Sequence, residues 1–179
     1  GGTANGSADP LMPAALRTAL RWVIDLSALA AVLIFISGYF PASLMFADTT
    51  ASGGDMGTHY YAAYFLRNEL LPKGQVTGWC PGNYCGFPLF QLYFPLPFFL
   101  MAVVSYVAVP LTVAFKLGTV LGTFLLPITA FLALRLAGVP FPGPAIGAFA
   151  PLPFLFMQDN SMWGGNVPST LAGEFALSL

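Results

Sequence analysis

Four apolar segments alternate with more polar stretches along the chain. They cover residues 22–40, 89–109, 111–134 and 144–157. A helix needs about 20 apolar residues to cross the hydrocarbon core of a bilayer, so the first and third segments predict membrane-spanning helices. The second segment carries prolines near its start, and the fourth is short and contains two prolines. We expect the fourth to cross only with help from its flanks.

The polar stretches between these segments predict the domain organisation. Residues 1–16 begin with small and polar side chains and predict a disordered tail, and residues 17–179 form the transmembrane domain. Within that domain we expect an outer loop at 41–88 and a second outer loop at 158–173. The chain turns apolar again at 173–179, which resembles the start of another helix, so we expect this to be a partial chain.

Composition makes the bilayer the expected solvent of this protein. The 179 residues are 57% hydrophobic and only 7% charged, whereas soluble domains carry about 25% charged residues. Six basic and seven acidic side chains cannot cover a surface in contact with water. The sequence therefore predicts an all-α integral membrane protein. A net charge of −1 also excludes a nucleic-acid partner, because no basic stripe is present to neutralise phosphates.

The distribution of arginines predicts the orientation in the membrane. Arg17 and Arg21 precede the first apolar segment, which places the N-terminus in the cytoplasm by the positive-inside rule. Arg135 lies on the same side only if an even number of crossings separates it from Arg21. We therefore expect the segment 89–109 to be re-entrant or interfacial, and both outer loops to share one side. The predicted location is the plasma or inner membrane, with several crossings.

The first outer loop contains the sequence pattern that most suggests a functional site, GGDMGTHYY. Glycines before an acidic residue favour a turn into a helix with Asp55 near its N-cap. Asp55 and His59 are four residues apart, so they share one helix face. Together they could bind a divalent cation, accept a proton or position a phosphate. The alternative is an N-capping aspartate beside a surface histidine.

Two cysteines lie in the same outer loop, within WCPGNYCGFP. The spacing of Cys80 and Cys85 would let a disulfide close a tight turn in an oxidising compartment. The alternative is a pair of unbonded thiols. A zinc site would need further ligands, and His59 is the sole histidine of the sequence.

Three charged residues lie inside or beside the apolar segments. Lys116 is costly near a membrane helix unless it reaches the interface or finds a partner, so it either snorkels or contacts a phosphate. Asp25 follows Arg21 by four residues, and we expect the two to pair at the cytoplasmic end. We assign Asp25 no chemical role.

Three stretches of the sequence resemble a known membrane family. They are GGDMGTHYYAAYFLRNELLPKG, GWCPGNYCGFPLFQLYFPLPFFL and GGNVPSTLAGEFALSL. The family is named as related to 6-pyruvoyl-tetrahydropterin synthase, although nothing in the chain is similar to the soluble pterin enzyme. By its layout the family resembles the GT-C-type glycosyltransferases. The resemblance implies a GT-C-like multi-helix bundle whose outer loop consists of helices on the membrane surface.

The resemblance also implies roles for particular residues. Asp55, His59 and Asp159 are the expected catalytic residues, and the acidic pair Asp55 and Asp159 could hold a divalent metal cation, Mg or Mn. Substrate or phosphate binding is expected at Lys116, Arg67 and Glu174. No Asp-x-Asp pair is present in either loop, which departs from the common GT-C pattern.

The function expected from this resemblance is sugar transfer from a polyprenyl-phosphate donor at the extracytoplasmic face. Membrane lipid and the polyprenyl-phosphate sugar would then be its partners. The alternative is a non-catalytic membrane subunit or scaffold that packs against other subunits. A transporter is a weaker hypothesis, because few ionisable residues lie in the apolar segments.

Overall fold

The computed structural model describes residues 12–82, 85–159 and 164–177 of the chain. The structure is mostly helical, as predicted, with one short β-hairpin that the sequence did not predict. The α-helices are α1 (Ala14–Ser37), α2 (Ala42–Met45), α3 (Met56–Phe65), α4 (Leu96–Val107), α5 (Leu111–Leu136), α6 (Gly143–Phe149), α7 (Leu152–Leu155) and α8 (Val167–Ala172). A π-helical turn η1 (Leu66–Leu70), 3₁₀ turns η2 (Leu71–Lys73) and η3 (Glu174–Leu177), and antiparallel strands β1 (Gly78–Cys80) and β2 (Phe87–Leu89) complete the fold.

Two helices of the described residues, α1 and α5, are long and apolar enough to cross a membrane. They contain 24 and 26 residues, which at about 1.5 Å per residue gives roughly 36 and 39 Å. The hydrocarbon core is about 30 Å thick. The first helix begins at Ala14, inside the predicted tail, and residues 1–11 of that tail lie outside the described residues.

The other two apolar segments form shorter helices. The second yields α4, whose 12 residues extend over only about 18 Å, and its re-entrant or interfacial position stays a prediction. The fourth is divided into α6 and α7, because proline removes a backbone donor and Pro151 stands at the N-cap of α7. In contrast, α5 continues through Pro127, which is fully buried.

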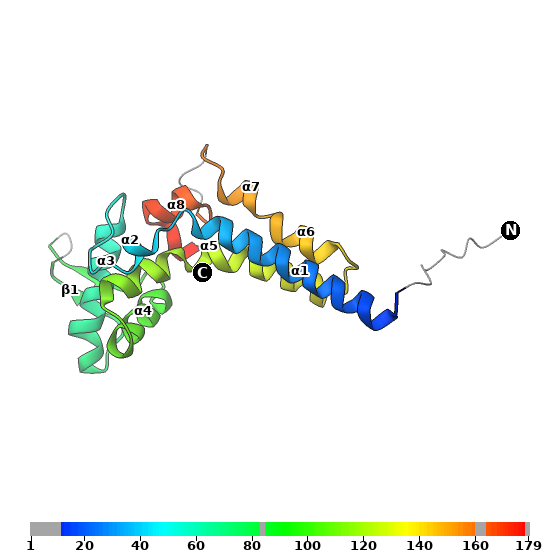
Figure 1. Ribbon diagram of the computed structural model, residues 1–179. Helices are drawn as coiled ribbons and strands as arrows, with labels where there is room; N and C mark the ends of the chain where they lie inside the picture. The colour runs from blue at the N-terminus through cyan, green and yellow to red at the C-terminus, as the bar shows by residue number, and fades with distance from the viewer. Residues whose placement is uncertain (1–11, 83–84, 160–163, 178–179) are drawn as a thin grey trace.

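The elements divide into a long bundle and a unit at one end of it. Helices α1, α5 and α6 lie side by side in the bundle, while α2, α3, α4 and the hairpin gather around the first turns of α5 (Figure 1). The chain runs away from that end along α5 and returns along α6 and α7. As a result, α8 and η3 lie close to α3 and α5, although about 100 residues separate them from α3 in the sequence.

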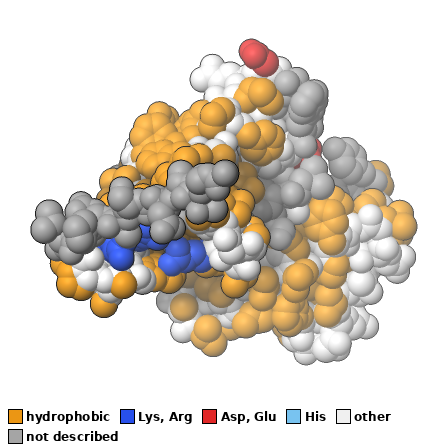
Figure 2. Space-filling model, turned by 90° about the vertical axis from the view of Figure 1, so that its right-hand side faces the viewer, with side chains coloured by type: hydrophobic (Ala, Val, Ile, Leu, Met, Phe, Trp, Pro, Cys, Tyr) orange, Lys and Arg blue, Asp and Glu red, His pale blue; other side chains and the backbone are white. Residues whose placement is uncertain are grey.

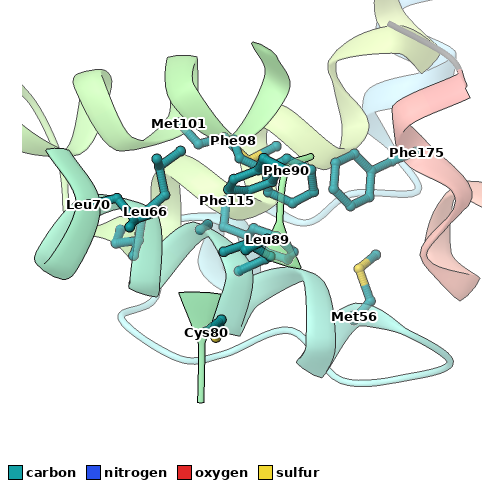
Figure 3. Packing of buried hydrophobic residues seen from close by; sticks show 13 residues of the cluster. Met56, Leu66, Leu70, Cys80, Leu89, Phe90, Phe98, Met101, Phe115 and Phe175 are labelled. Carbon is teal, nitrogen blue, oxygen red and sulfur yellow. The ribbon is translucent and has the colours of Figure 1, made fainter. Parts of the chain in front are cut away.

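The end unit has an aromatic core to which the last turn of the described chain contributes. Phe90, Phe98, Phe115 and Phe175 lie together in it, each 4% exposed or less (Figure 3). Burial of one such side chain contributes about 1.5–3 kcal/mol. Phe175 belongs to η3, so its insertion fixes the neighbouring Glu174 against the end unit.

The buried acidic residue of the bundle does not pair as predicted. Asp25 is completely buried and its Oδ2 accepts a hydrogen bond from Nη1 of Arg135 at 3.1 Å. The guanidinium of Arg135 also lies 3.5 Å from the ring centroid of Trp22. The expected pair with Arg21 is therefore wrong, because antiparallel packing of α1 and α5 brings a residue 110 positions away within reach.

Candidate functional site

The glycine-rich turn before α3 docks directly on the C-terminal end of α8. The backbone N–H of Asp55 donates to the carbonyl of Ala172 at 2.8 Å. A Cβ on Gly54 would lie 2.1 Å from that carbonyl oxygen, and one on Gly173 would lie 3.0 Å from Cβ of Asp55. Both glycines also have positive φ angles, 47° and 116°, which favour glycine. Their absent side chains let the two turns touch, and Glu174 follows at once.

His59 lies one helical turn after Asp55, and its backbone N–H donates to the Asp55 carbonyl at 3.0 Å. Its ring is stacked on Tyr93 at 5.7 Å between centroids and contacts Phe98 at 5.8 Å and Phe175 at 5.4 Å. Two segments far from α3 in the sequence, one with Tyr93 and Phe98 and one with Phe175, therefore hold the imidazole in place. We call Asp55, His59, Tyr93 and Glu174 the carboxylate–histidine cluster.

Burial and charge act in opposite directions on the cluster. Burial lowers the pKa of His59, and the nearby carboxylates of Asp55 and Glu174 oppose this more weakly by raising it. The pKa of Tyr93 is raised by burial first, then by Glu174 and Asp55. At neutral pH the imidazole and the phenol are thus uncharged beside two carboxylates. A neutral imidazole can accept a proton.

Asp55 occupies the predicted N-cap position of α3, yet its side chain makes no capping hydrogen bond. The residue is also exposed. The simple explanation, an aspartate that caps its own helix, therefore does not account for the carboxylate. The carboxylate of Asp55 is therefore accessible to a ligand that binds at the surface of the cluster.

An apolar groove of about 540 Å³ adjoins the cluster. Phe94 lines the groove and stacks on Tyr93 at 4.3 Å between ring centroids. Ala176, two residues after Glu174, lines it as well. The remaining lining comes from α4 and α5 and consists of Leu96, Pro97, Leu100, Met101, Val104, Ala114, Leu117, Gly118, Leu121 and Leu125. The cluster and the groove thus share two chain segments.

Lys116, predicted to bind phosphate, is bonded elsewhere. Its Nζ donates to the carbonyls of Leu44 and Ala47, both at 2.6 Å, and lies 3.5 Å from Oγ1 of Thr49. Beside it, Oγ1 of Thr112 donates to the carboxylate of Asp48. These contacts fasten the loop after α2 to α5, and they occupy the ammonium donors that a phosphate would need.

Arg67 is likewise engaged by its neighbours. Its Nε donates to Oγ of Ser105 at 2.7 Å and its Nη1 to Oδ1 of Asn68 at 3.0 Å. The guanidinium lies 4.8 Å from the ring centroid of Tyr106, whose hydroxyl donates to the Arg67 carbonyl. Of the three residues expected at the phosphate, Glu174 alone belongs to the cluster.

Asp159, the second predicted acidic residue, is exposed and has no hydrogen bond or ion pair within the described ranges. No contact among the described residues therefore links Asp159 to Asp55, and its catalytic role stays a prediction. In residues 12–82, 85–159 and 164–177, no group of three or more His, Cys, Asp or Glu side chains could hold a metal ion. The expected Mg or Mn site of two carboxylates stays a prediction, and no step proposed below depends on a metal.

The predicted disulfide is also not formed in the structure. Cys80 is buried at the end of β1, Cys85 is exposed, and both are free thiols. Cys85 has a φ of 68°, a left-handed conformation that is uncommon for residues other than glycine. The alternative of two unbonded thiols describes this hairpin.

Tyr93 is the residue of the cluster that sequence reasoning did not single out. It lies in the run LFQLYFPLPFF, where an aromatic residue suggests contact with the membrane interface. Glu174 was predicted to bind substrate, but not as a neighbour of Asp55 and His59. One signal could have linked Glu174 to Asp55. Each acidic residue directly follows a glycine, Gly54 or Gly173, and both glycines have positive φ angles in the structure.

Comparison with known proteins identifies the family. No curated protein sequence and no solved structure matches the chain significantly. Residues 90–179, which are 90 of the 179, match the family model described as "6-pyruvoyl-tetrahydropterin synthase related domain; membrane protein". That match covers α4, α5 and the C-terminal segment of the cluster, and it agrees with two helices able to cross a membrane. The chain therefore belongs to the 6-pyruvoyl-tetrahydropterin synthase related domain family of membrane proteins.

Proposed function

We propose that this protein is a GT-C-like glycosyltransferase that takes a sugar from a polyprenyl-phosphate donor at the extracytoplasmic face of the membrane. The observation that carries the proposal is the position of the carboxylate–histidine cluster at the apolar groove. The cluster contains groups that can accept or donate a proton. Its members Tyr93 and Glu174 are close in sequence to Phe94 and Ala176, which line the groove. The groove is an apolar surface suited to a hydrocarbon chain. A lipid-linked sugar needs both features within the length of one molecule.

The proposed reaction is a displacement at the anomeric carbon of the sugar. Asp55 accepts the proton of an acceptor hydroxyl, whose oxygen forms the new glycosidic bond. The bond between the anomeric carbon and the phosphate oxygen breaks, and polyprenyl phosphate leaves with the electron pair. His59, held against Tyr93, is a second proton acceptor beside Asp55. The apolar groove holds the polyprenyl chain and orients the phosphate toward the cluster.

The first experiment removes the proposed base without changing its shape. Purified wild-type protein and Asp55→Asn are incubated with polyprenyl-phosphate hexoses that carry a radiolabelled sugar, with a membrane extract as the source of acceptor. Loss of a general base costs about 10²–10⁴-fold in rate, so the variant should transfer at most about 1% as fast. Glu69→Gln is the matched control, because Glu69 is an exposed carboxylate that pairs with Lys73. Equal rates for wild type and Asp55→Asn would refute the proposal.

A second experiment fills the groove and leaves the cluster intact. Leu121 lines the groove and is 44% exposed, whereas Leu136, the last residue of the same helix, is 86% exposed and does not line the groove. Leu121→Trp should raise KM for a long-chain donor and have little effect on a donor with a short chain. Leu136→Trp should behave as wild type with both donors. An equal change in KM for the long-chain and the short-chain donor would mean that the groove does not bind the chain of the donor.

The alternative function is a non-catalytic subunit, and the exposure of α1 favours it. Val23, Ile34 and Phe35 are 59%, 70% and 48% exposed, which leaves an apolar helix face that other subunits could cover. The same variants distinguish the two functions. If Asp55→Asn leaves cellular glycans unchanged but disrupts a membrane complex, the subunit function holds.

A further inference from the structure

The ring of Tyr93 contacts both the imidazole of the cluster and a ring in the wall of the apolar groove. Its centroid lies 5.7 Å from that of His59 and 4.3 Å from that of Phe94, and in each pair the ring planes differ by 24°. Among the described residues, Tyr93 is the ring that Phe94 contacts. Tyr93 therefore connects the groove wall to the imidazole.

The orientation of the imidazole depends on ring contacts. The His59 side chain makes no hydrogen bond within the described residues, and its neighbouring rings are those of Tyr93, Phe98 and Phe175. Phe98 and Phe175 are fully buried in the aromatic core (Figure 3), where close packing restricts movement. Tyr93 is only half-buried. It is therefore the neighbour of His59 whose position can change most easily.

The position of Tyr93 depends in turn on Phe94. Both residues lie in the irregular segment between β2 and α4, and neither makes a hydrogen bond in the part of the chain that the structure describes. Packing alone holds their rings. Phe94 is 42% exposed and lines the groove, so a molecule in the groove covers this ring and reduces its freedom. Occupancy of the groove thereby restricts Phe94 and, through the stacked rings, Tyr93.

The occupant that fits the groove is a hydrocarbon chain from the bilayer. The groove follows α5 from Ala114 to Leu125, which is roughly 16 Å along the helix axis, and α5 is apolar and long enough to cross a membrane. No charged side chain belongs to its described lining. The face of the bundle shown in Figure 2 is also largely hydrophobic, as expected for a surface in contact with lipid. A soluble sugar phosphate has no apolar part to place in such a groove.

We propose that Tyr93 is a positioning residue, and that a polyprenyl chain in the groove fixes the orientation of the His59 imidazole through Phe94 and Tyr93. The inference rests on the proposed function, because it makes the chain of the lipid-linked donor a condition for rapid transfer. Binding energy from a part of the substrate remote from the reacting carbon is then used to orient a proton acceptor. A sugar phosphate without the chain leaves both rings less restricted and reacts more slowly.

The test follows the NMR signals of the His59 ring, because His59 is the sole histidine of the sequence. The full chain, purified without a histidine tag and labelled with isotope-enriched histidine, is kept in digitonin, which has no alkyl chain to fill the groove. At about pH 8 the imidazole is neutral, since burial lowers its pKa from the ordinary value of about 6.5. The titratable groups that face it, Asp55, Glu174 and Tyr93, therefore contribute equally with and without ligand. Farnesol, a prenyl chain without phosphate, should shift the His59 signals to saturation, whereas inorganic phosphate should not.

Three variants separate the ring contacts from binding of the chain, which is measured in parallel with tritiated farnesol. Phe94→Leu keeps the groove apolar but removes the ring that stacks on Tyr93, so farnesol should bind and the His59 shift should be lost. Tyr93→Phe keeps the stacked ring and should retain the shift. Leu100→Ala is the matched control, because Leu100 lines the groove, is 52% exposed and belongs to α4. It should weaken farnesol binding and still give the full shift at saturation.

Three outcomes would overturn the inference. The first is a full His59 shift in Phe94→Leu with farnesol bound. The second is an unchanged His59 signal in wild type with farnesol bound, and the third is no binding of farnesol to wild type. These results are distinct from a failure of the proposed function. A His59 shift without any transfer of sugar would refute the transferase alone, and transfer without the shift would refute the positioning role of Tyr93 alone.

Discussion

Replacement of Arg135 by methionine is the sharpest test of the bundle. Arg135 donates to Asp25 at 3.1 Å, and the other carboxylate oxygen of Asp25 is buried with no hydrogen-bond partner. Arg135→Met keeps the length of an unbranched side chain and removes the charge. The carboxylate of Asp25, which is 0% exposed, is then buried without compensation.

The expected loss of stability follows from that burial. Removal of one partner from a buried ion pair costs about 3–5 kcal/mol. The side chain of Arg135 is 26% exposed, so solvent screens part of its charge and the lower value applies, about 3 kcal/mol. Loss of the contact with Trp22 adds about 1 kcal/mol. If Asp25 paired locally with Arg21 instead, Arg21→Met would be the more destabilising change. The structure predicts that Arg21→Met lowers the free energy of unfolding by less than about 0.5 kcal/mol.

Unfolding is measured by titration of SDS into a zwitterionic detergent, and tryptophan fluorescence is the signal because Trp22 lies against Arg135. Arg135→Met should unfold at much lower SDS fraction than Arg21→Met. A second change, Asp25→Asn, in the Arg135→Met background should restore most of the loss, since no charge is then buried. The reasoning is refuted if Arg21→Met costs as much as Arg135→Met, or if Asp25→Asn restores nothing.

Three further predictions concern the end unit and its hairpin. Gly173→Ala should lower the free energy of unfolding by about 2 kcal/mol because Gly173 has a positive φ. Gly57→Ala in α3, with nothing within 4 Å of the new Cβ, should raise it by about 0.5 kcal/mol. Equal effects would contradict the close contact between the turns at Gly54 and Gly173. The lowered pKa of His59 means that the unfolded chain binds a proton more readily than the folded protein, so stability should fall as pH drops below about 6.5. The variant His59→Phe should show a weaker dependence of stability on pH. An unchanged slope in this variant would contradict the burial of His59. Exposed Cys85 should react with a maleimide in the folded protein, while buried Cys80 reacts after unfolding, and a chain with neither thiol reactive would contain the disulfide instead.

Local features of the sequence determined the elements of the fold. Hydropathy runs long enough to span a bilayer predicted α1 and α5, and Pro110 set the start of α5. The turn before Asp55 and the helix that follows could be predicted as well, because glycine freedom and N-cap position are properties of neighbouring residues. The break between α6 and α7 was less predictable from length and hydropathy, although Pro151 marks it.

Apart from the local pair of Glu69 and Lys73, tertiary structure decided which charged groups meet. Asp25 bonds to Arg135, Lys116 to one carbonyl of α2 and one of the loop after it, and Glu174 joins Asp55 and His59. The physical reason is that a buried charge is satisfied by whichever partner helix packing brings within about 3 Å, irrespective of separation along the chain. Hydrophobic pattern selects which face of a helix is buried, but the register of one helix against another follows from side-chain shape and from glycines that permit close approach. The candidate site is therefore a product of that packing.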